Sequence, residues 1–209
     1  MKAVYIERHG GPDVLKYGEV NDPIIESNEV LVNVKACALN RLDLYTRAGR
    51  RGTKRNFESP HVLGSDVSGI IIEVGSSVVG IEVGMRVLVN PRITCMQCNQ
   101  CVSNRSELCL NTSMVGSEIM GGYAERLAVP STSVFPIPDS LGFAEAASLP
   151  TVFMPSWNIL VRTAQLQPWE TVLVPSASSG VGTAAVQVAR NISKATVIAL
   201  SLIHISEPT

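Results

Sequence analysis

Short runs of alternating apolar and polar residues dominate the first 140 residues of the chain. Between residues 30 and 36, every second side chain is Val or Ala, which is the two-residue period of a half-buried strand. Further strands are predicted at Lys2–Ile6, 67–74, 85–89 and 125–129, and a short helix at 42–48 that ends at Gly49. Because glycine and proline separate many short strands, we expect a compact, barrel-like β domain.

The pattern changes after Pro138. Segments 141–149 and 156–164 have helical composition, interrupted at Pro150 and Pro155. A strand at Thr171–Val174, a turn, a helix and a second strand at Thr196–Ala199 are predicted next. The helix follows from an i, i+3, i+4, i+7 apolar spacing at Val181, Ala184, Ala185, Val188, Ala189 and Ile192. This order predicts one βαβ unit, which cannot cover its own sheet alone.

Composition narrows the class of protein. The chain has 209 residues, 45% of them hydrophobic, which is ample for a core. Its formal net charge is −1 and the basic residues are scattered, so we expect no nucleic-acid or membrane-surface partner. No uncharged apolar run approaches the ~20 residues of a transmembrane helix. Charges at Glu7 and Arg8 interrupt any secretory signal, so a cytoplasmic location is expected.

Four of the five cysteines lie in one short run, Cys95-x2-Cys98-x2-Cys101-x7-Cys109. Zinc binds four thiolates in a tetrahedron, and x2 spacings let a tight turn aim successive sulfurs at one point. Four cysteines leave no position for water or substrate, so the predicted zinc is structural. Two disulfides are one alternative, disfavoured in a reducing cytosol, and a redox C-x-x-C pair is another. Cys37, the fifth cysteine, is predicted to be a small core residue.

A glycine-containing turn between the strand Thr171–Val174 and the following helix has the pattern Ala-x-x-Gly-x-Gly. Glycines there permit a tight turn and let the backbone approach a pyrophosphate at the helix N-terminus. The hydroxyl groups of Ser178 and Ser179 would add donors for phosphate. The predicted cofactor-binding residues are Ala177, Ser178, Ser179, Gly180, Val181 and Gly182. An ordinary strand-to-helix turn is the alternative.

The last ten residues, 200–209, look like one translated frame of a transposase-based sequencing-library adapter. We therefore expect native sequence to stop near Ala199 and the tail to be an assembly artefact. A native strand is the alternative, because Leu202, His204 and Ser206 alternate with isoleucines.

Several motifs together resemble the medium-chain dehydrogenase/reductases. Besides the cysteine quartet and the glycine turn, these are Met1-Lys-Ala-Val, Val62-Leu-Gly-Ser-Asp-Val-Ser-Gly69 and Gly121-Gly-Tyr-Ala-Glu125. The resemblance implies a chaperonin-10-like β-rich barrel domain at 1–140 with a zinc lobe at 91–112. A truncated α/β Rossmann domain would follow at 141–199, so the chain looks like the N-terminal part of such an enzyme. It also implies NAD(P)(H), with NADP slightly preferred, a small-molecule substrate and, for the full-length protein, a homo-oligomer.

The chain departs from this pattern at the catalytic metal. Zinc-dependent alcohol dehydrogenases place a cysteine at the position of Asn40 and a His-Glu pair at Ser65-Asp66; their third ligand falls near Thr151. Neutral oxygen donors do not make a tight zinc site. The zinc of the lobe is therefore expected to be kept and the catalytic zinc lost.

The remaining residues resemble the quinone oxidoreductases of this superfamily, which carry an Asn-x-x-Asp-x-Tyr run. Asn40, Asp43 and Tyr45 match that run and are the predicted catalytic residues. The implied function is NAD(P)H-dependent reduction of quinones or activated double bonds, with hydrogen-bond donors polarising the substrate carbonyl. The alternatives are a zinc-dependent alcohol dehydrogenase and a non-catalytic nucleotide-binding relative. The 209-residue chain by itself is expected to be inactive.

Overall fold

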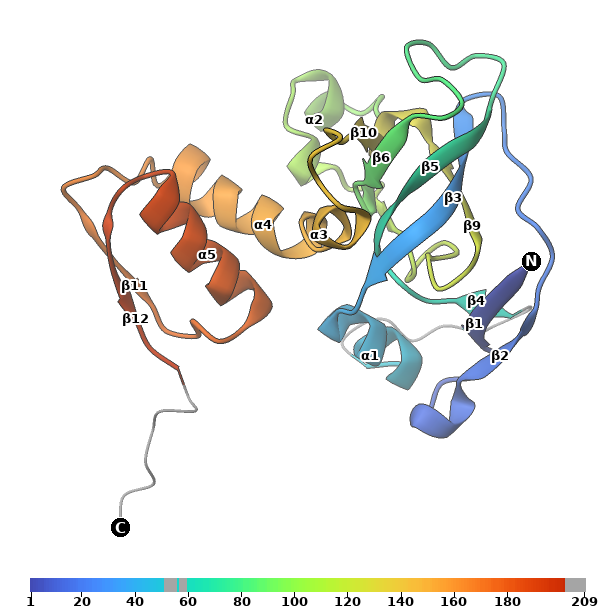
Figure 1. The fold of residues 1–209 in the computed structure, drawn as a ribbon, viewed down its shortest axis with the longest axis horizontal. Coiled ribbons are helices and arrows are strands. Elements are labelled where there is room, and N and C mark those ends of the chain that lie inside the picture. The colour runs from blue at the N-terminus through green and yellow to red at the C-terminus, as the bar shows by residue number, and fades with distance from the viewer. Residues whose placement is uncertain (51–55, 57–59, 202–209) are drawn as a thin grey trace. The chain divides into compact units, whose positions relative to one another are not determined.

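The computed structural model describes residues 1–50, 56 and 60–201, and shows two compact units (Figure 1). The first unit is Met1–Ser148, and the second begins at Leu149. Residues 202–209, most of the tail assigned to an adapter, lie outside the described residues.

An antiparallel sheet of five strands forms the centre of the first unit. Its order is β10-β6-β5-β3-β9, with bounds β3 Glu29–Ala38, β5 Asp66–Val74, β6 Arg86–Val89, β9 Arg126–Pro130 and β10 Val134–Pro136. These strands agree with the alternating pattern of the sequence. Val30 and Val32 of β3 are fully buried, as are Val67 and Ile71 of β5. The apolar face that the two-residue period predicts is therefore the core of the sheet.

A second sheet, β2-β1-β4, lies beside the first. Its strands are β1 Lys2–Ile6, β2 Lys16–Glu19 and β4 His61–Val62. The segment just before β9 joins the two sheets, because the Val4 N–H donates to the Tyr123 carbonyl at 2.7 Å and the Val34 N–H donates to the Glu125 carbonyl at 2.9 Å. Hydrogen bonds on both sides of one segment give the barrel-like arrangement that the sequence predicts.

Short helices connect these strands. The helix predicted at 42–48 is α1, Arg41–Ala48, and Gly49 ends it in the left-handed conformation at φ 65°. The other short helical elements of the first unit are η1 Pro12–Val14, α2 Asn99–Val102, η2 Ser106–Leu108, η3 Ser131–Ser133 and α3 Phe143–Ala147. A small pair, β7 Arg92–Ile93 with β8 Ser113–Met114, closes the base of the cysteine-bearing loop.

The first unit extends beyond the predicted boundary at residue 140. Its last helix, α3, contacts β3, β5 and β6. The Ser68 hydroxyl donates to the Phe143 carbonyl at 2.6 Å, and the Arg86 guanidinium donates to the Leu141 carbonyl at 2.6 Å. These contacts attach residues 141–148 to the sheet, although their composition differs from that of the strands.

The second unit contains one βαβ unit, as the sequence predicts. Strands β11 Thr171–Val174 and β12 Thr196–Ala199 are parallel, and helix α5, Gly180–Asn191, connects them. Leu160, Val188 and Ala189 form its small core. Leu173 and Ile198, one on each strand, remain exposed. No described helix is long and apolar enough to cross a membrane.

The expected interruption at Pro150 is confirmed, because α3 ends at Ala147 and a new helix begins at Pro150, but the expected interruption at Pro155 is wrong. Helix α4, Pro150–Trp157, begins at Pro150 and passes through Pro155, and a π-helix, η4 Asn158–Thr163, continues it. Proline fits the first helical position because its missing N–H would have no partner there. Pro155 cannot donate the backbone N–H of a regular helical hydrogen bond, so α4 lacks one bond at this position. Irregular helical turns, such as the π-helix η4, accompany prolines inside helices.

Adjacent isoleucines in β5 provide a test of the core. We expect Ile71→Ala to lower the free energy of unfolding by about 2–5 kcal/mol, because a fully buried side chain leaves a cavity. Ile72→Ala is the matched control; Ile72 is 37% exposed, and its truncation should cost less than about 1 kcal/mol. Urea denaturation measures both values, and equal losses would contradict the burial of Ile71.

Candidate functional site

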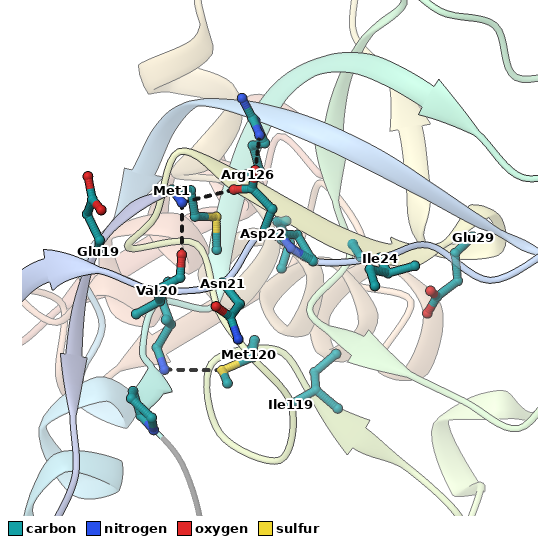
Figure 2. Close-up of a pocket in the computed structure, with 15 residues that line it drawn as sticks. Met1, Glu19, Val20, Asn21, Asp22, Ile24, Glu29, Ile119, Met120 and Arg126 are labelled. Carbon is teal, nitrogen blue, oxygen red and sulfur yellow. Dashed lines mark hydrogen bonds and ion pairs between the residues drawn. The ribbon is translucent and has the colours of Figure 1, made fainter.

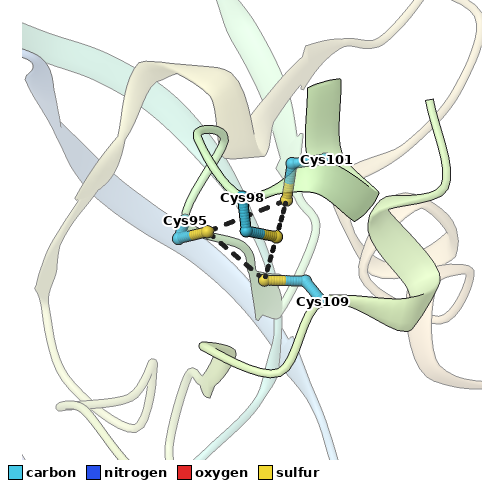
Figure 3. Close-up of side chains that lie close together, drawn as sticks. All are labelled: Cys95, Cys98, Cys101 and Cys109. Atoms are coloured by element: carbon cyan, nitrogen blue, oxygen red, sulfur yellow. Dashed lines mark hydrogen bonds between the residues drawn. The ribbon is translucent and has the colours of Figure 1, made fainter. Parts of the chain in front are cut away.

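Four cysteine sulfurs converge in the loop between β7 and β8 (Figure 3). Cys95 follows β7, and Met96 then adopts φ 56°, which turns the chain sharply toward Cys98. Cys98 caps the N-terminus of α2, and Cys101 lies within that helix. Cys109 follows the single turn of η2. Each sulfur is thus positioned by a turn or helix end, as the x2 spacings predict.

The sulfur separations fit a tetrahedral metal site. Four of them are 3.5 Å (Cys109–Cys95), 3.6 Å (Cys98–Cys101), 3.8 Å (Cys98–Cys109) and 3.9 Å (Cys95–Cys101). Sulfurs bound to zinc at about 2.3 Å would lie about 3.8 Å apart, whereas a disulfide needs about 2.05 Å. All five cysteines lie in the described residues, and all are free thiols. The donor set therefore fits zinc.

Backbone amides favour the thiolate form of Cys95, whereas desolvation raises the pKa of Cys101 to about 12. The N–H groups of Gln97 and Cys98 donate to the Cys95 sulfur and lower the pKa of its thiol to about 6. Zinc binds the thiolate, so a thiol that already ionises near neutral pH releases its proton to the metal at a small cost.

A second cluster of polar groups surrounds the N-terminus of α1, where β3 ends. Asn40 caps the helix and forms a capping box with Asp43, whose carboxylate Oδ2 accepts the Asn40 backbone N–H at 2.7 Å. The Asn40 side-chain amide donates to Asp66 Oδ2 at 2.9 Å. Tyr123 donates its hydroxyl to Asp43 Oδ2, also at 2.9 Å. The structure therefore brings Asn40 and Asp43 together with Asp66 and Tyr123.

The carboxyl group of Asp43 is buried, with the residue only 5% exposed. Burial raises the pKa of Asp43, and hydrogen bonds from the Asn40 backbone and the Tyr123 hydroxyl oppose that effect. Burial also raises the pKa of Tyr123, with the Asp43 charge adding to it. Tyr123 thus keeps its proton and acts as the donor of this pair.

Tyr45 occupies a different position from the other two predicted catalytic residues. It lies two residues after Asp43, on another face of α1, and is half-buried. Its catalytic role stays a prediction. Sequence reasoning missed the roles of Asp66 and Tyr123, since Asp66 was considered only as a metal ligand and Tyr123 only as part of a family motif.

Cys37, near the end of β3, lies outside the quartet. Burial, together with the charges of Asp43 and Asp66, raises the pKa of its thiol to about 12. An uncharged, half-buried thiol agrees with the predicted core role.

The predicted cofactor-binding residues form the turn between β11 and α5. Ser179 caps α5, where its hydroxyl accepts the Gly182 N–H at 3.0 Å and donates to the Ser176 carbonyl at 2.8 Å. A Cβ at Gly182 would lie 1.9 Å from the Ser176 oxygen, so the tight turn requires glycine there. Because the Ser179 hydroxyl closes the turn, it does not supply the free phosphate donor that the sequence suggested. Ser178 is exposed, and its hydroxyl accepts from Ser201.

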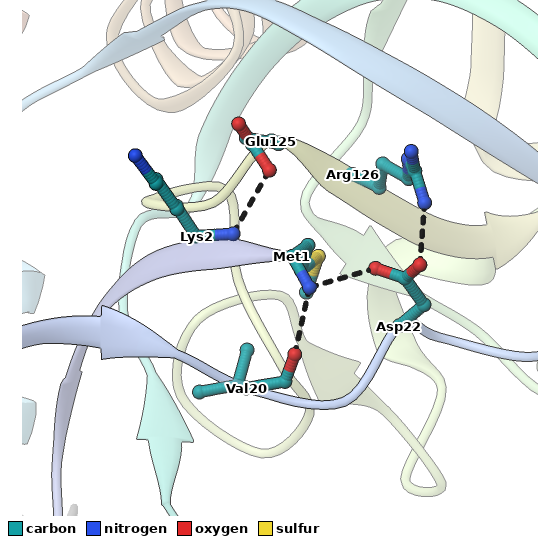
Figure 4. Close-up of polar contacts among 6 residues, drawn as sticks. All are labelled: Met1, Lys2, Val20, Asp22, Glu125 and Arg126. Carbon is teal, nitrogen blue, oxygen red and sulfur yellow. Dashed lines mark hydrogen bonds and ion pairs between the residues drawn. The ribbon is translucent and has the colours of Figure 1, made fainter.

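A pocket of about 590 Å³ lies away from both clusters (Figure 2). Its wall includes Met1, Asp22 and Arg126. Asp22 pairs with the Met1 amino group at 3.0 Å and with Arg126 at 2.5 Å (Figure 4). Hydrogen bonding by that amino group lowers the pKa of Asp22, and the Arg126 charge adds to the effect. These pairs fasten the start of β1 to β9, and none of the predicted site residues lines the pocket.

Comparison with known proteins identifies the family. The profile of the alcohol dehydrogenase GroES-like domain matches residues 26–139, more than half of the chain. The chain belongs to the medium-chain dehydrogenase/reductases.

Quinone oxidoreductases and alcohol dehydrogenases are both among the relatives of this medium-chain dehydrogenase/reductase. It is 33% identical to a quinone oxidoreductase of Mus musculus over 91% of the chain and 49% of the relative. It is 34% identical to an NAD-dependent alcohol dehydrogenase of Saccharolobus solfataricus over 97% of the chain and 59% of the relative. A cobalt- and zinc-bound thermostable alcohol dehydrogenase of Pyrobaculum aerophilum superposes with a TM-score of 0.87 at 33% identity, over 97% of this chain and 60% of that one. The chain thus spans about half the length of these relatives.

The cysteine quartet predicts the zinc content of this dehydrogenase/reductase chain. We expect about one zinc per chain, held by four thiolates. Cys98→Ser should lose that zinc and open the lobe to protease, because one strong ligand is removed. The control Cys37→Ala should retain it. Elemental analysis and limited proteolysis measure both effects; an unchanged zinc content in Cys98→Ser would argue against this site.

Thiol reactivity provides an independent test of the environments of Cys37 and the four lobe cysteines. The high pKa of Cys37 keeps it protonated at pH 8, and the thiolate is the reactive form. A chelator should open the metal-free lobe, so that a chromogenic disulfide reagent modifies its four newly exposed cysteines rapidly and Cys37 only after denaturation. Cys37→Ala should remove only the slow phase. Modification of Cys37 as fast as the lobe cysteines would contradict its protection.

Proposed function

We propose that the full-length protein is an NAD(P)H-dependent oxidoreductase that reduces quinones or activated double bonds, with one structural zinc and no catalytic zinc. One observation carries this proposal. At positions where zinc-dependent alcohol dehydrogenases hold their catalytic metal, Asn40 and Asp66 are hydrogen-bonded to each other at 2.9 Å.

The donor set at these positions supports the absence of a catalytic zinc. Tight zinc sites use thiolate, imidazole or carboxylate ligands. Asn40 and Ser65 offer only neutral oxygens, and one oxygen of the Asp66 carboxylate already accepts a hydrogen bond. A single carboxylate beside two weak donors does not hold zinc firmly.

Hydrogen bonds can replace the metal for activated substrates. An amide N–H or a hydroxyl aimed at a carbonyl oxygen stabilises the negative charge that develops on it. In this proposal Asn40 supplies the N–H and Tyr45 the hydroxyl, while Asp43 and Tyr123 hold the N-terminus of α1 in place. A bound nicotinamide supplies the hydride. Oxidation of a saturated alcohol fits less well, because it requires an alkoxide that a metal would stabilise.

The turn between β11 and α5 supports dinucleotide binding. It follows a strand of a parallel pair, leads into a twelve-residue helix and has a glycine where the backbone approaches closely. The N–H groups of a first helical turn bind phosphate well. We propose that residues 177–182 bind the pyrophosphate and that this unit begins a Rossmann domain. NADP is slightly preferred as the cofactor.

The similarity to alcohol dehydrogenases supports a second candidate function. Similarity to an NAD-dependent alcohol dehydrogenase and to a cobalt- and zinc-bound alcohol dehydrogenase favours a zinc-dependent alcohol dehydrogenase as the alternative. A non-catalytic relative would bind the cofactor without turnover. Zinc content separates the first two, since a reductase should hold about one zinc per chain and a zinc-dependent dehydrogenase about two.

Kinetics of the full-length protein test the proposal. We expect turnover of quinones or enones, and Asn40→Ser should lower kcat by about 10²–10³ because an N–H to the developing oxyanion is lost. Serine also caps helices, but the buried Asp66 carboxylate loses a donor, so the free energy of unfolding should fall by about 1–3 kcal/mol. The control is Asn28→Ser, at an exposed position, which should leave kcat unchanged.

Oxidation of simple alcohols with two zincs per chain would favour the alternative enzyme. Cofactor binding without turnover of any quinone, enone or aldehyde would favour the non-catalytic relative.

A further inference from the structure

We propose that Asp66 is a positioning residue that fixes the amide of Asn40 so that one N–H remains directed at the substrate. This inference rests on the proposed function, because it concerns the residue that orients Asn40, the proposed N–H donor to the substrate.

Strand register places the two residues together. Asp66, the first residue of β5, pairs with Ala38, the last residue of β3. Asn40 follows two residues later, where the chain turns into α1. The pairing of β3 with the central strand β5 thus determines the separation of the two side chains. Sheet positions hold functional groups more accurately than loops do.

The burial and charge of Asp66 determine which end of the Asn40 amide it binds. Asp66 is only 1% exposed, and a buried carboxylate requires hydrogen-bond donors. The Asn40 Nδ2 atom supplies one of them at 2.9 Å. An ionised carboxylate only accepts hydrogen bonds, so it selects the NH2 end of the amide and rejects the oxygen end. The charge also makes this bond stronger than a neutral one.

The other end of the amide lies toward the helix. The capping box places the Asn40 side-chain oxygen toward the Asp43 backbone N–H, which donates to the Asn40 backbone carbonyl at 3.2 Å, and the Asp43 carboxylate accepts the Asn40 backbone N–H at 2.7 Å. An amide has two N–H donors, and Asp66 takes one. With the oxygen directed at the helix and one N–H at Asp66, the second N–H has a defined direction. This is the donor that the substrate carbonyl requires.

The variant Asp66→Asn tests this role. It preserves size and hydrogen-bonding capacity, but a neutral amide can present either its oxygen or its NH2 group to Asn40. In the full-length enzyme we expect kcat for quinone reduction to fall about tenfold or more, as for loss of a charge-assisted bond at the site. The control Asp139→Asn, at a fully exposed position, should leave kcat unchanged.

A double-mutant cycle separates positioning from a general structural effect. If Asp66 acts through Asn40, Asp66→Asn should change kcat less than about twofold in the Asn40→Ser background. An equal fall in both backgrounds would overturn the inference. If Asn40→Ser lowers kcat but Asp66→Asn does not, the positioning role fails and the proposed function stands. If Asn40→Ser leaves kcat unchanged, both fail.

A spectroscopic measurement is independent of turnover. The two side-chain N–H signals of Asn40 should differ in chemical shift and exchange slowly with solvent in the parent protein, because one is bonded to Asp66. In Asp66→Asn they should move and exchange faster. Unchanged signals would show that Asp66 does not orient the amide, whatever the activity.

Discussion

The pairing of β3 with β5 supports both the core and the candidate site of this protein. The two strands run side by side at the centre of the five-stranded sheet and bury Val30, Val32, Val67 and Ile71. Apolar burial of this kind is the main favourable contribution to folding. The same register brings the end of β3 to the start of β5, where Asn40 meets Asp66. Stability and site geometry therefore depend on one set of strand contacts.

The cysteine lobe is stabilised in a different way from the five-stranded sheet. Between Cys95 and Cys109 the larger apolar side chains, Met96, Val102 and Leu108, are all exposed, so this stretch has little core of its own. The four sulfurs take the place of that core, at separations that suit a tetrahedral metal. Folding of such a loop is coupled to metal binding, whereas the sheet is stabilised by its own packing.

The polar cluster at α1 depends on hydrogen bonds that are mutually consistent. Asp43 accepts from the Asn40 backbone and from Tyr123, while Asp66 accepts from the Asn40 side chain. Buried polar groups stabilise a single arrangement when their partners are present and cost free energy when they are not. Asn40, at the end of β3, and Asp66, at the start of β5, are thereby connected by a hydrogen bond.

Local patterns in the sequence determined most strands, the helix α1, the βαβ unit and the convergence of four cysteines, because each depends on residues close together in the chain. Tertiary structure alone decided the contacts of Asp66 and Tyr123, which join segments far apart in sequence through strand register. It also decided that α3 belongs to the first unit and that α4 continues through Pro155. Packing against neighbouring elements overrides local propensity at such positions. Those elements are distant in sequence, so a short-range pattern does not predict them.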